Sequence, residues 1–332
     1  MSFTSNFRGA RRLFLAGIFL LLAGAGSFAQ AQGAYPSRPI QLIVPYPPGG
    51  SVDALARVVG QKLAESVGQP VVIENRPGGN TIIGTAAVAK AAPDGHTLLL
   101  TASTHVINVA LGMKQPYDSL KDFAPVSTVI KSDFILVVNP ALGVDNVQQL
   151  VALAKARPGQ LNYGTSSVGN SNHLAAELFS QTTGAQLHHV PYKGAVQALT
   201  DLMGGRLQIF FSVPANVLPH IASGKLKALA TTAKDPLPGL APIPSFAQSG
   251  VPNFNVESWQ GILAPAGTPK PIVDLLAAHL ARIVAQPDVK EKLLAQGQQP
   301  FSVSGEKFAE LMRSDLTMYS RVIKAANIKL EE

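Results

Sequence analysis

The sequence between residues 40 and 53 reads Ile40-Gln41-Leu42-Ile43-Val44-Pro45-Tyr46-Pro47-Pro48-Gly49-Gly50-Ser51-Val52-Asp53. Its first five residues are mostly large aliphatics and predict a buried strand, which the prolines and glycines after Val44 end. Beyond the glycines, apolar residues recur every three or four positions from Val52 to Leu63, as on one face of a helix. The stretch therefore predicts a strand, a glycine-rich loop and a helix in direct succession.

The same alternation continues along the chain. Further strands are expected at residues 71–73, 98–100, 161–165, 188–190, 209–211 and 226–230, with helices between several of them. Strands that alternate with helices at this spacing favour parallel sheets covered on both faces. From residue 269 the chain is expected to be mostly helical, over 271–285, 289–296 and 307–326.

The length of 332 residues is about twice that of a usual single domain and predicts two α/β lobes. We expect residues 34–131 and 255–332 to form lobe one, with the C-terminal helices packed on it, and residues 132–254 to form lobe two. Two crossing segments, near 126–138 and 255–264, would form a hinge. Ligands bind beyond the carboxyl ends of strands in open α/β sheets, so the cleft between the lobes is the expected site.

Composition excludes several classes of protein. With 46% hydrophobic and 14% charged residues, the chain is not disordered, and without cysteine it has no disulfide, thiolate metal site or cysteine nucleophile. Its 27 basic and 20 acidic residues give +7, but three of the positive charges, Arg8, Arg11 and Arg12, lie in the first twelve residues. The other basic residues are scattered, so no nucleic-acid partner is expected.

The N-terminus predicts an export signal. The three arginines precede an apolar run of about a dozen residues, 13–23, and then Ala29-Gln30-Ala31. This pattern predicts a signal peptide over residues 1–31, cleaved near Ala31, and a periplasmic mature protein. The run is shorter than the ~20 residues that span a bilayer. A buried N-terminal helix is the alternative, and the Arg11-Arg12 pair leaves the general and twin-arginine export routes open.

The loop after the first strand carries features of an anion site. Gly49 and Gly50 leave the backbone N–H groups accessible, Ser51 adds a hydroxyl, and a helix N-terminus favours negative charge by about 0.3–1 kcal/mol. Asp53 would compete for the same amides, cap the helix or orient neighbouring donors. A simple tight turn is the alternative interpretation. The ligand-binding residues predicted here are Tyr46, Pro48, Gly49, Gly50, Ser51 and Asp53.

A second polar loop repeats this design in lobe two. Residues 165–173 read Thr-Ser-Ser-Val-Gly-Asn-Ser-Asn-His, and the candidates are Thr165, Ser166, Ser167, Gly169, Asn170 and His173. We expect His173 to donate a hydrogen bond to a carboxylate or to a backbone carbonyl, with a purely structural role as the alternative. Shorter loops add the candidates Ser103, Thr104, Lys193, Gly194, Ala195 and Ser212. Ordinary polar connections are an equal alternative for these shorter loops.

Enzymatic motifs are incomplete. Gly79 and Gly84 have the spacing of a phosphate loop, but Thr85-Ala86 stands where Lys and Ser or Thr are required. The segment 164–168 lacks the final glycine of a nucleophile elbow. His188 and His189 are adjacent on a predicted strand and would face opposite sides, so they cannot share a metal. We therefore expect binding without catalysis, and no metal or cofactor.

Several segments together resemble one known family. They are 35–40, 44–50, 72–79, 93–98, Tyr163-Gly164 with His173-Leu174, 189–194, 218–221 with 224–226, and 263–269. From about Tyr35 to Ile328 the chain resembles the Bug family, the substrate-binding receptors of tripartite tricarboxylate transporters.

The resemblance implies a two-lobed α/β fold of the type II periplasmic-binding-protein (Venus-flytrap) architecture. It implies a monomeric receptor that captures a small carboxylate and passes it to a membrane permease. The ligand would be a di- or tricarboxylate, an amino acid or an aromatic acid, held by backbone amides, hydroxyls and waters rather than by an arginine. Neither of the two main loops contains Arg or Lys, which agrees with this implication.

The sequence also departs from the family pattern. The family usually has Thr-Asp where this chain has Val52-Asp53, Ala-Pro near Val196-Gln197, and Asp at Gln208. Fewer hydroxyls and a glutamine would suit a less polar or larger carboxylate. Two alternative functions stay open: the sensing input of a periplasmic signalling receptor, and an exported hydrolase whose serine is activated by His105 or His173.

Overall fold

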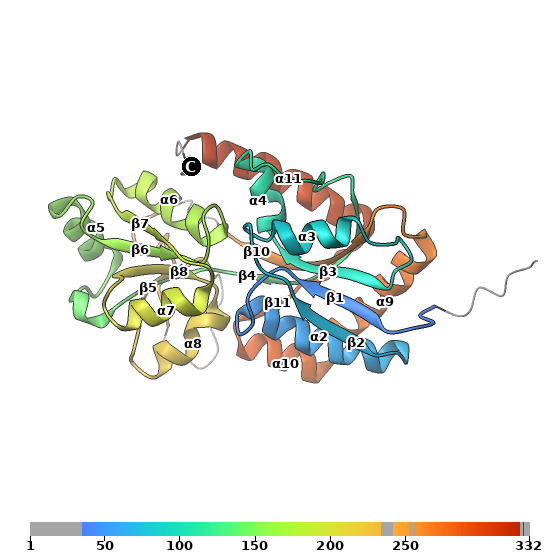
Figure 1. Ribbon diagram of the computed structural model, residues 1–332. Helices are drawn as coiled ribbons and strands as arrows, with labels where there is room; N and C mark the ends of the chain where they lie inside the picture. The colour runs from blue at the N-terminus through green and yellow to red at the C-terminus, as the bar shows by residue number, and fades with distance from the viewer. Residues whose placement is uncertain (1–34, 234–241, 253, 255, 326–327, 329–332) are drawn as a thin grey trace, which may run out of the picture. The chain divides into compact units, whose positions relative to one another are not determined.

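The computed structural model describes residues 35–233, 242–252, 254, 256–325 and 328. The predicted signal peptide at 1–31 lies outside these residues. Both sheets of the protein belong to one compact unit that begins at Arg38 (Figure 1). In the described part of the chain, no helix combines the length and apolarity needed to cross a membrane.

The first sheet has six strands in the order β11-β4-β10-β3-β1-β2. They are β1 (Ile40–Val44), β2 (Val71–Asn75), β3 (Thr97–Ala102), β4 (Phe123–Ser132), β10 (Ser258–Pro265) and β11 (Gln298–Pro300). The helices around this sheet are α2 (Ser51–Val67), α3 (Ile82–Ala89), α4 (Thr104–Ala110), α9 (Lys270–Ala285), α10 (Pro287–Ala295) and α11 (Gly305–Ala325). The C-terminal helices pack on this sheet, as predicted, with α9 and α11 both contacting β4 (Figure 1).

The second sheet has five strands in the order β7-β6-β8-β5-β9. They are β5 (Ile135–Val138), β6 (Asn162–Thr165), β7 (His188–Pro191), β8 (Ile209–Ser212) and β9 (Lys227–Thr231). Its helices are α5 (Val147–Ala156), α6 (Ser171–Thr183), α7 (Ala195–Met203) and α8 (Pro214–Ala222), with a short 3-10 turn at Pro140–Leu142. Apart from Ser132, the last residue of β4, the strands of each sheet fall within one predicted lobe. The lobe boundaries themselves stay a prediction.

The expectation of parallel sheets is correct for only some of the strand pairs. β1 runs parallel to β2 and β3, but β10 lies antiparallel between β3 and β4. The reason is topological, because β4 precedes the second sheet along the chain and β10 follows it, so the two strands run in opposite directions. In the second sheet, β6 is parallel to β7 and β8, while β5 is antiparallel to β8 and β9.

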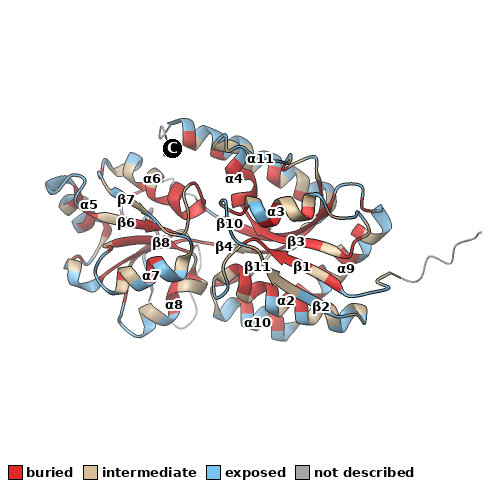
Figure 2. Ribbon diagram, viewed as in Figure 1, coloured by how far each residue is buried: buried red, intermediate tan, exposed pale blue. Residues whose placement is uncertain are grey.

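Alternation along the strands explains why both faces of the second sheet are covered. Leu136 and Val138 of β5 pack into the apolar cluster that includes α5 and α6. Ile135 and Val137, one position away, pack into the cluster that includes α7 and α8. Side chains on a strand point alternately to opposite faces, so a strand that is apolar at every position needs helices on both sides. Figure 2 shows strands that are largely buried and helices exposed on their outer sides.

Candidate ligand-binding site

Asp53 organises the loop between β1 and α2, residues 45–50. Its carboxylate is buried and accepts hydrogen bonds from the Gly49 N–H at 3.0 Å, from Arg57 Nε at 3.1 Å and Nη2 at 3.0 Å, and from Asn75 Nδ2 at 3.0 Å. Burial by itself would raise the pKa of Asp53, but these bonds outweigh it and hold that pKa below its usual value. Of its predicted roles, Asp53 therefore performs the orienting one, and no side chain caps α2.

The hydrogen bond to Asp53 occupies the Gly49 N–H. The backbone N–H groups that follow it, at the start of α2, are left for a ligand. Gly49 adopts a φ of +85°, which an L side chain rarely tolerates, and Gly50 precedes the first turn of α2. The first N–H groups of a helix have no partner within the helix. Among the described residues the structure records no hydrogen bond from the Ser51 hydroxyl, so this group stays available beside them.

The neighbouring strand end holds one predicted residue, Ser103, in a structural hydrogen bond. Ser103 is fully buried, and its hydroxyl accepts the Trp259 N–H at 3.0 Å, which ties β3 to β10. Thr104 begins α4, which corrects the expectation that Ser103, Thr104 and His105 form a loop. The Tyr46 hydroxyl is buried near Thr101 and Thr104, and this burial raises the pKa of Tyr46. Tyr46 therefore keeps its proton as a neutral donor.

His173 fixes the second loop from within lobe two. Its Nδ1 accepts the Gly169 N–H at 2.9 Å, and its own backbone N–H donates to Asn170 Oδ1 at 3.0 Å. Nδ1 is therefore an acceptor, and the expected donation from the ring can come only from Nε2. This atom lies 3.8 Å from the Glu177 carboxylate, which is longer than a hydrogen bond. The Asn170 amide also donates to Ser166 Oγ at 2.5 Å, whereas no bond from the Ser167 hydroxyl is recorded within the described residues.

Both buried histidines near the predicted loops are neutral. Burial, and secondarily His189 stacked at 4.1 Å between ring centroids, lowers the pKa of His173 to about 3. Burial lowers the pKa of His105 to about 4, and its Nε2 lies 2.8 Å from the Ser119 carbonyl oxygen. Neither ring is hydrogen-bonded to a serine hydroxyl in the described structure, so the hydrolase alternative gains no support.

Because both histidines are neutral in the folded protein, its free energy of unfolding should decrease as the pH is lowered. The unfolded chain takes up their protons near pH 6.5 and the folded chain only near pH 4 or pH 3, so unfolding binds protons between those values. Each histidine should lower the free energy of unfolding, measured in urea, by up to about 1.4 kcal/mol per pH unit as pH drops from 6.5 to 4. Asp315, whose pKa burial raises to about 6, opposes one of them over part of this window, so the net fall should be nearer to that of a single histidine. A flat profile over this window would contradict the neutral state of both rings.

Loops from the two sheets contact one another. A Cβ added at Gly194 would lie 3.3 Å from Pro47 Cγ, and one added at Gly49 would lie 3.9 Å from Val196 Cγ2. The N-terminus of α7, which begins after Gly194, is therefore close to that of α2. Thr165 at the end of β6 pairs with Pro191 at the end of β7, so the loop before α6 leaves the sheet at the same edge as the loop before α7. The N-termini of α2, α6 and α7 therefore belong to this set of loops.

Two arginines near these loops are paired with carboxylates, because Arg57 is bonded to Asp53 and Arg76 to Glu74. Lys193 is exposed and stays a predicted ligand contact. The donors that the loops present are therefore mainly uncharged N–H and O–H groups. Ser212 fits this description, because its hydroxyl is buried at the end of β8 with no hydrogen-bond partner among the described residues.

Gln208 does not bear on ligand size. Its side-chain oxygen accepts the Asn162 N–H at 2.9 Å, and its amide donates to the Gly205 carbonyl at 3.1 Å. Asn162 begins β6, so this contact lies at the opposite end of the strand from the loop after Thr165. The inference that a glutamine here suits a larger carboxylate is therefore wrong.

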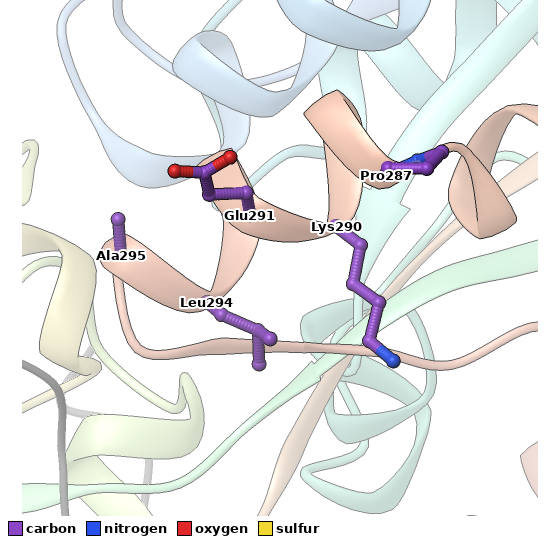
Figure 3. Close-up of a pocket in the computed structure, with 5 residues that line it drawn as sticks. All are labelled: Pro287, Lys290, Glu291, Leu294 and Ala295. Carbon is purple, nitrogen blue, oxygen red and sulfur yellow. The ribbon is translucent and has the colours of Figure 1, made fainter.

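A surface hollow of about 460 Å³ lies on α10 and is separate from these loops (Figure 3). Its lining residues are Pro287, Lys290, Glu291, Leu294 and Ala295. None of them belongs to the loops described above. Within the described ranges, no three His, Cys, Asp or Glu side chains come together in a way that could hold a metal ion.

Facing loops at the strand ends of two α/β lobes, rich in uncharged donors, define a two-lobed solute-binding protein of the periplasmic type. A family model described as the tripartite tricarboxylate transporter family receptor matches residues 55–328. The chain belongs to this family. The resemblance and the two-lobed fold class predicted from the sequence are both confirmed.

Individual relatives cover nearly the whole chain. Protein BugT of Bordetella pertussis is 39% identical over 323 residues, which are 97% of this chain and 99% of that protein. Rpa4515 of R. palustris, solved with adipate, is 33% identical with a TM-score of 0.86, covering 89% of this chain and 99% of the other. MatC of Rhodopseudomonas palustris, solved with bound malate, is 29% identical with a TM-score of 0.80, covering 87% and 100%.

Proposed function

We propose that the protein is a periplasmic receptor that captures a small carboxylate between its lobes and delivers it to a tripartite tricarboxylate transporter permease. The observation that carries this proposal is the set of facing loops with uncharged donors at the N-termini of α2, α6 and α7. Helix N-termini favour anions. The two solved relatives with adipate and malate support a small dicarboxylate as the ligand class.

The donors are sufficient for tight binding without a positive side chain. A hydrogen bond to a charged partner contributes about 1.5–3 kcal/mol. Five or six such bonds exceed the ~8 kcal/mol of a micromolar complex and leave a margin for ligand immobilisation and lobe closure. In this proposal Ser51 serves the first carboxylate-binding loop, and Ser167 serves the loop that closes from lobe two.

Removal of both hydroxyls should weaken binding. We expect the double variant Ser51→Ala with Ser167→Ala to lose at least roughly tenfold in affinity for its carboxylate, measured by titration calorimetry. Ser223→Ala is the matched control, because Ser223 follows α8 and its hydroxyl donates to the His220 carbonyl. Equal affinity in the double variant and the control would reject these two site residues.

A ligand screen tests the proposed function itself. The mature protein, purified from the periplasm, would be melted with malate, adipate, citrate, glutamate and benzoate in turn. A ligand present at about 100 times its dissociation constant should stabilise the fold by about 2.7 kcal/mol. Stabilisation by none of these acids would remove the support for a carboxylate receptor. Co-purification with a signalling receptor instead of the permease would favour the sensing alternative.

A further inference from the structure

The segment after β2 has an unusual backbone that the proposed site does not use. Four consecutive residues have positive φ: Gly78 at +126°, Gly79 at +55°, Asn80 at +51° and Thr81 at +75°. Residues other than glycine rarely adopt this region, least of all β-branched ones such as threonine. Such conformations persist only where the surrounding contacts impose them, which raises the question of what this turn holds in place.

The turn presents the side chain of Asn80 to lobe two. Asn80 Nδ2 donates to Asn108 Oδ1 at 2.6 Å and to the Val168 carbonyl oxygen at 2.9 Å. Asn108, fully buried on α4, donates in return to the Asn80 carbonyl oxygen at 2.8 Å. Asn108 therefore fixes the Asn80 amide within lobe one, and the second N–H of that amide reaches the loop that precedes α6.

The bond to Val168 is one of two hydrogen bonds that hold the peptide group between Val168 and Gly169. The Val168 carbonyl and the Gly169 N–H belong to the same peptide unit. Lobe one holds its oxygen through Asn80, and lobe two holds its N–H through His173 Nδ1. This unit begins one residue after Ser167, the residue assigned to the ligand. Its fixation therefore restrains the backbone next to Ser167.

Apolar contacts reinforce the same junction. Leu111, which follows α4, packs so closely on the second loop that a Cβ at Gly169 would lie 1.9 Å from Leu111 Cδ1. Leu174 of α6 is buried in the apolar cluster that contains Val106 and Ile107 of α4. The junction between α4 and the start of α6 is therefore a packed contact between the lobes, with the Asn80 bond beside it.

We propose that Asn80, held by Asn108, is a positioning residue that fixes the second anion-binding loop in its closed arrangement without touching the ligand. This inference rests on the proposed function. In this proposal the bond breaks when the lobes separate, so it raises the fraction of closed protein, and apparent affinity rises with that fraction. The contact therefore acts on ligand release, because the loop must leave Asn80 before the carboxylate can escape.

The test uses three substitutions. Asn80→Gly keeps the positive φ and removes the amide. Asn80→Asp keeps the shape but places an oxygen opposite two acceptors. Asn108→Ala removes the support of the amide.

Stopped-flow measurements with adipate and malate give the rates of ligand association and dissociation. We expect the dissociation rate to be at least about fivefold higher in Asn80→Gly than in the wild type, and higher still in Asn80→Asp. The association rate should stay within about twofold of the wild type. The double variant with Asn80→Gly and Asn108→Ala should release the ligand no faster than Asn80→Gly alone, because Asn108 acts through the Asn80 amide.

A ligand-free measurement separates this inference from the proposed function. The chain has no native cysteine, so spin labels on Lys121→Cys in lobe one and Gln160→Cys in lobe two report the distance between the lobes cleanly. Asn80→Gly should shift the distances to longer values, with thermal unfolding confirming that both lobes stay folded. Unchanged distances and dissociation rates would overturn the closure role. If neither acid binds the wild type, an acid that stabilises it in the ligand screen takes their place in the kinetic test. If no acid in that screen binds, the proposed function fails, and the distances alone decide the role of Asn80.

Discussion

Replacement of Asp53 by asparagine should destabilise the protein and disrupt the first anion-binding loop. The carboxylate accepts four hydrogen bonds, so a side-chain NH₂ in place of either oxygen would face N–H donors inside a buried site. Hydrogen bonds to charged groups contribute about 1.5–3 kcal/mol each, and we expect the free energy of unfolding to fall by about 2–4 kcal/mol. Affinity for the carboxylate should fall with it, since Gly49 loses its acceptor.

Arg57→Gln provides the matched control for Asp53. The Arg57 side chain is 59% exposed, and exposed ion pairs contribute only about 0–1 kcal/mol. Chemical denaturation of both variants, with calorimetric titration of each, should therefore show a much larger effect at Asp53. Equal losses in the two variants would mean that the ion pair, and not the Gly49 and Asn75 bonds, organises the loop.

Gly169→Ala should have the second large effect, chiefly on affinity. Gly169 has a φ of +72°, where an L-residue costs about 1–2 kcal/mol of stability. The added Cβ would also collide with Leu111 when the lobes are together. Overpacking of this kind typically costs about 1–3 kcal/mol, which corresponds to an affinity lower by roughly five- to 150-fold if closure bears the cost.

Rescue distinguishes the collision from the backbone strain. Combining Gly169→Ala with Leu111→Ala removes the side chain that the new methyl group meets, so most of the lost affinity should return while the lost stability does not. Titration calorimetry and urea denaturation on the single and double variants measure the two quantities. No recovery of affinity in the double variant would show that Leu111 does not limit closure.

Hydrophobic pattern predicted much of the fold. The strand expected from Ile40 to Val44 is observed with those bounds, and helices expected at 271–285 and 289–296 are observed at Lys270–Ala285 and Pro287–Ala295. The antiparallel placement of β10 was missed, because strand direction depends on the path of the whole chain and not on local sequence. Helix α4 was also missed, since Ser103-Thr104-His105 has the composition of a loop, yet all three residues are buried in tertiary contacts.

The loops of the site were predictable, but the partners of their side chains were not. Glycines and hydroxyls after two strands indicated where donors gather. They could not show that Ser103 is bonded to Trp259, which lies 156 residues away, or that His173 accepts from Gly169. Asn80 was missed altogether. The glycine pair before it was a visible signal of a left-handed turn, but only the structure reveals that the turn reaches Val168.

A crystal structure of the mature protein with adipate or malate tests the central claim most directly. The account predicts a ligand carboxylate within about 2.7–3.2 Å of backbone N–H groups at the starts of α2 and α6, beside Ser51 and Ser167, with no arginine touching it. A carboxylate held instead by an arginine, or seated in the hollow on α10, would contradict it.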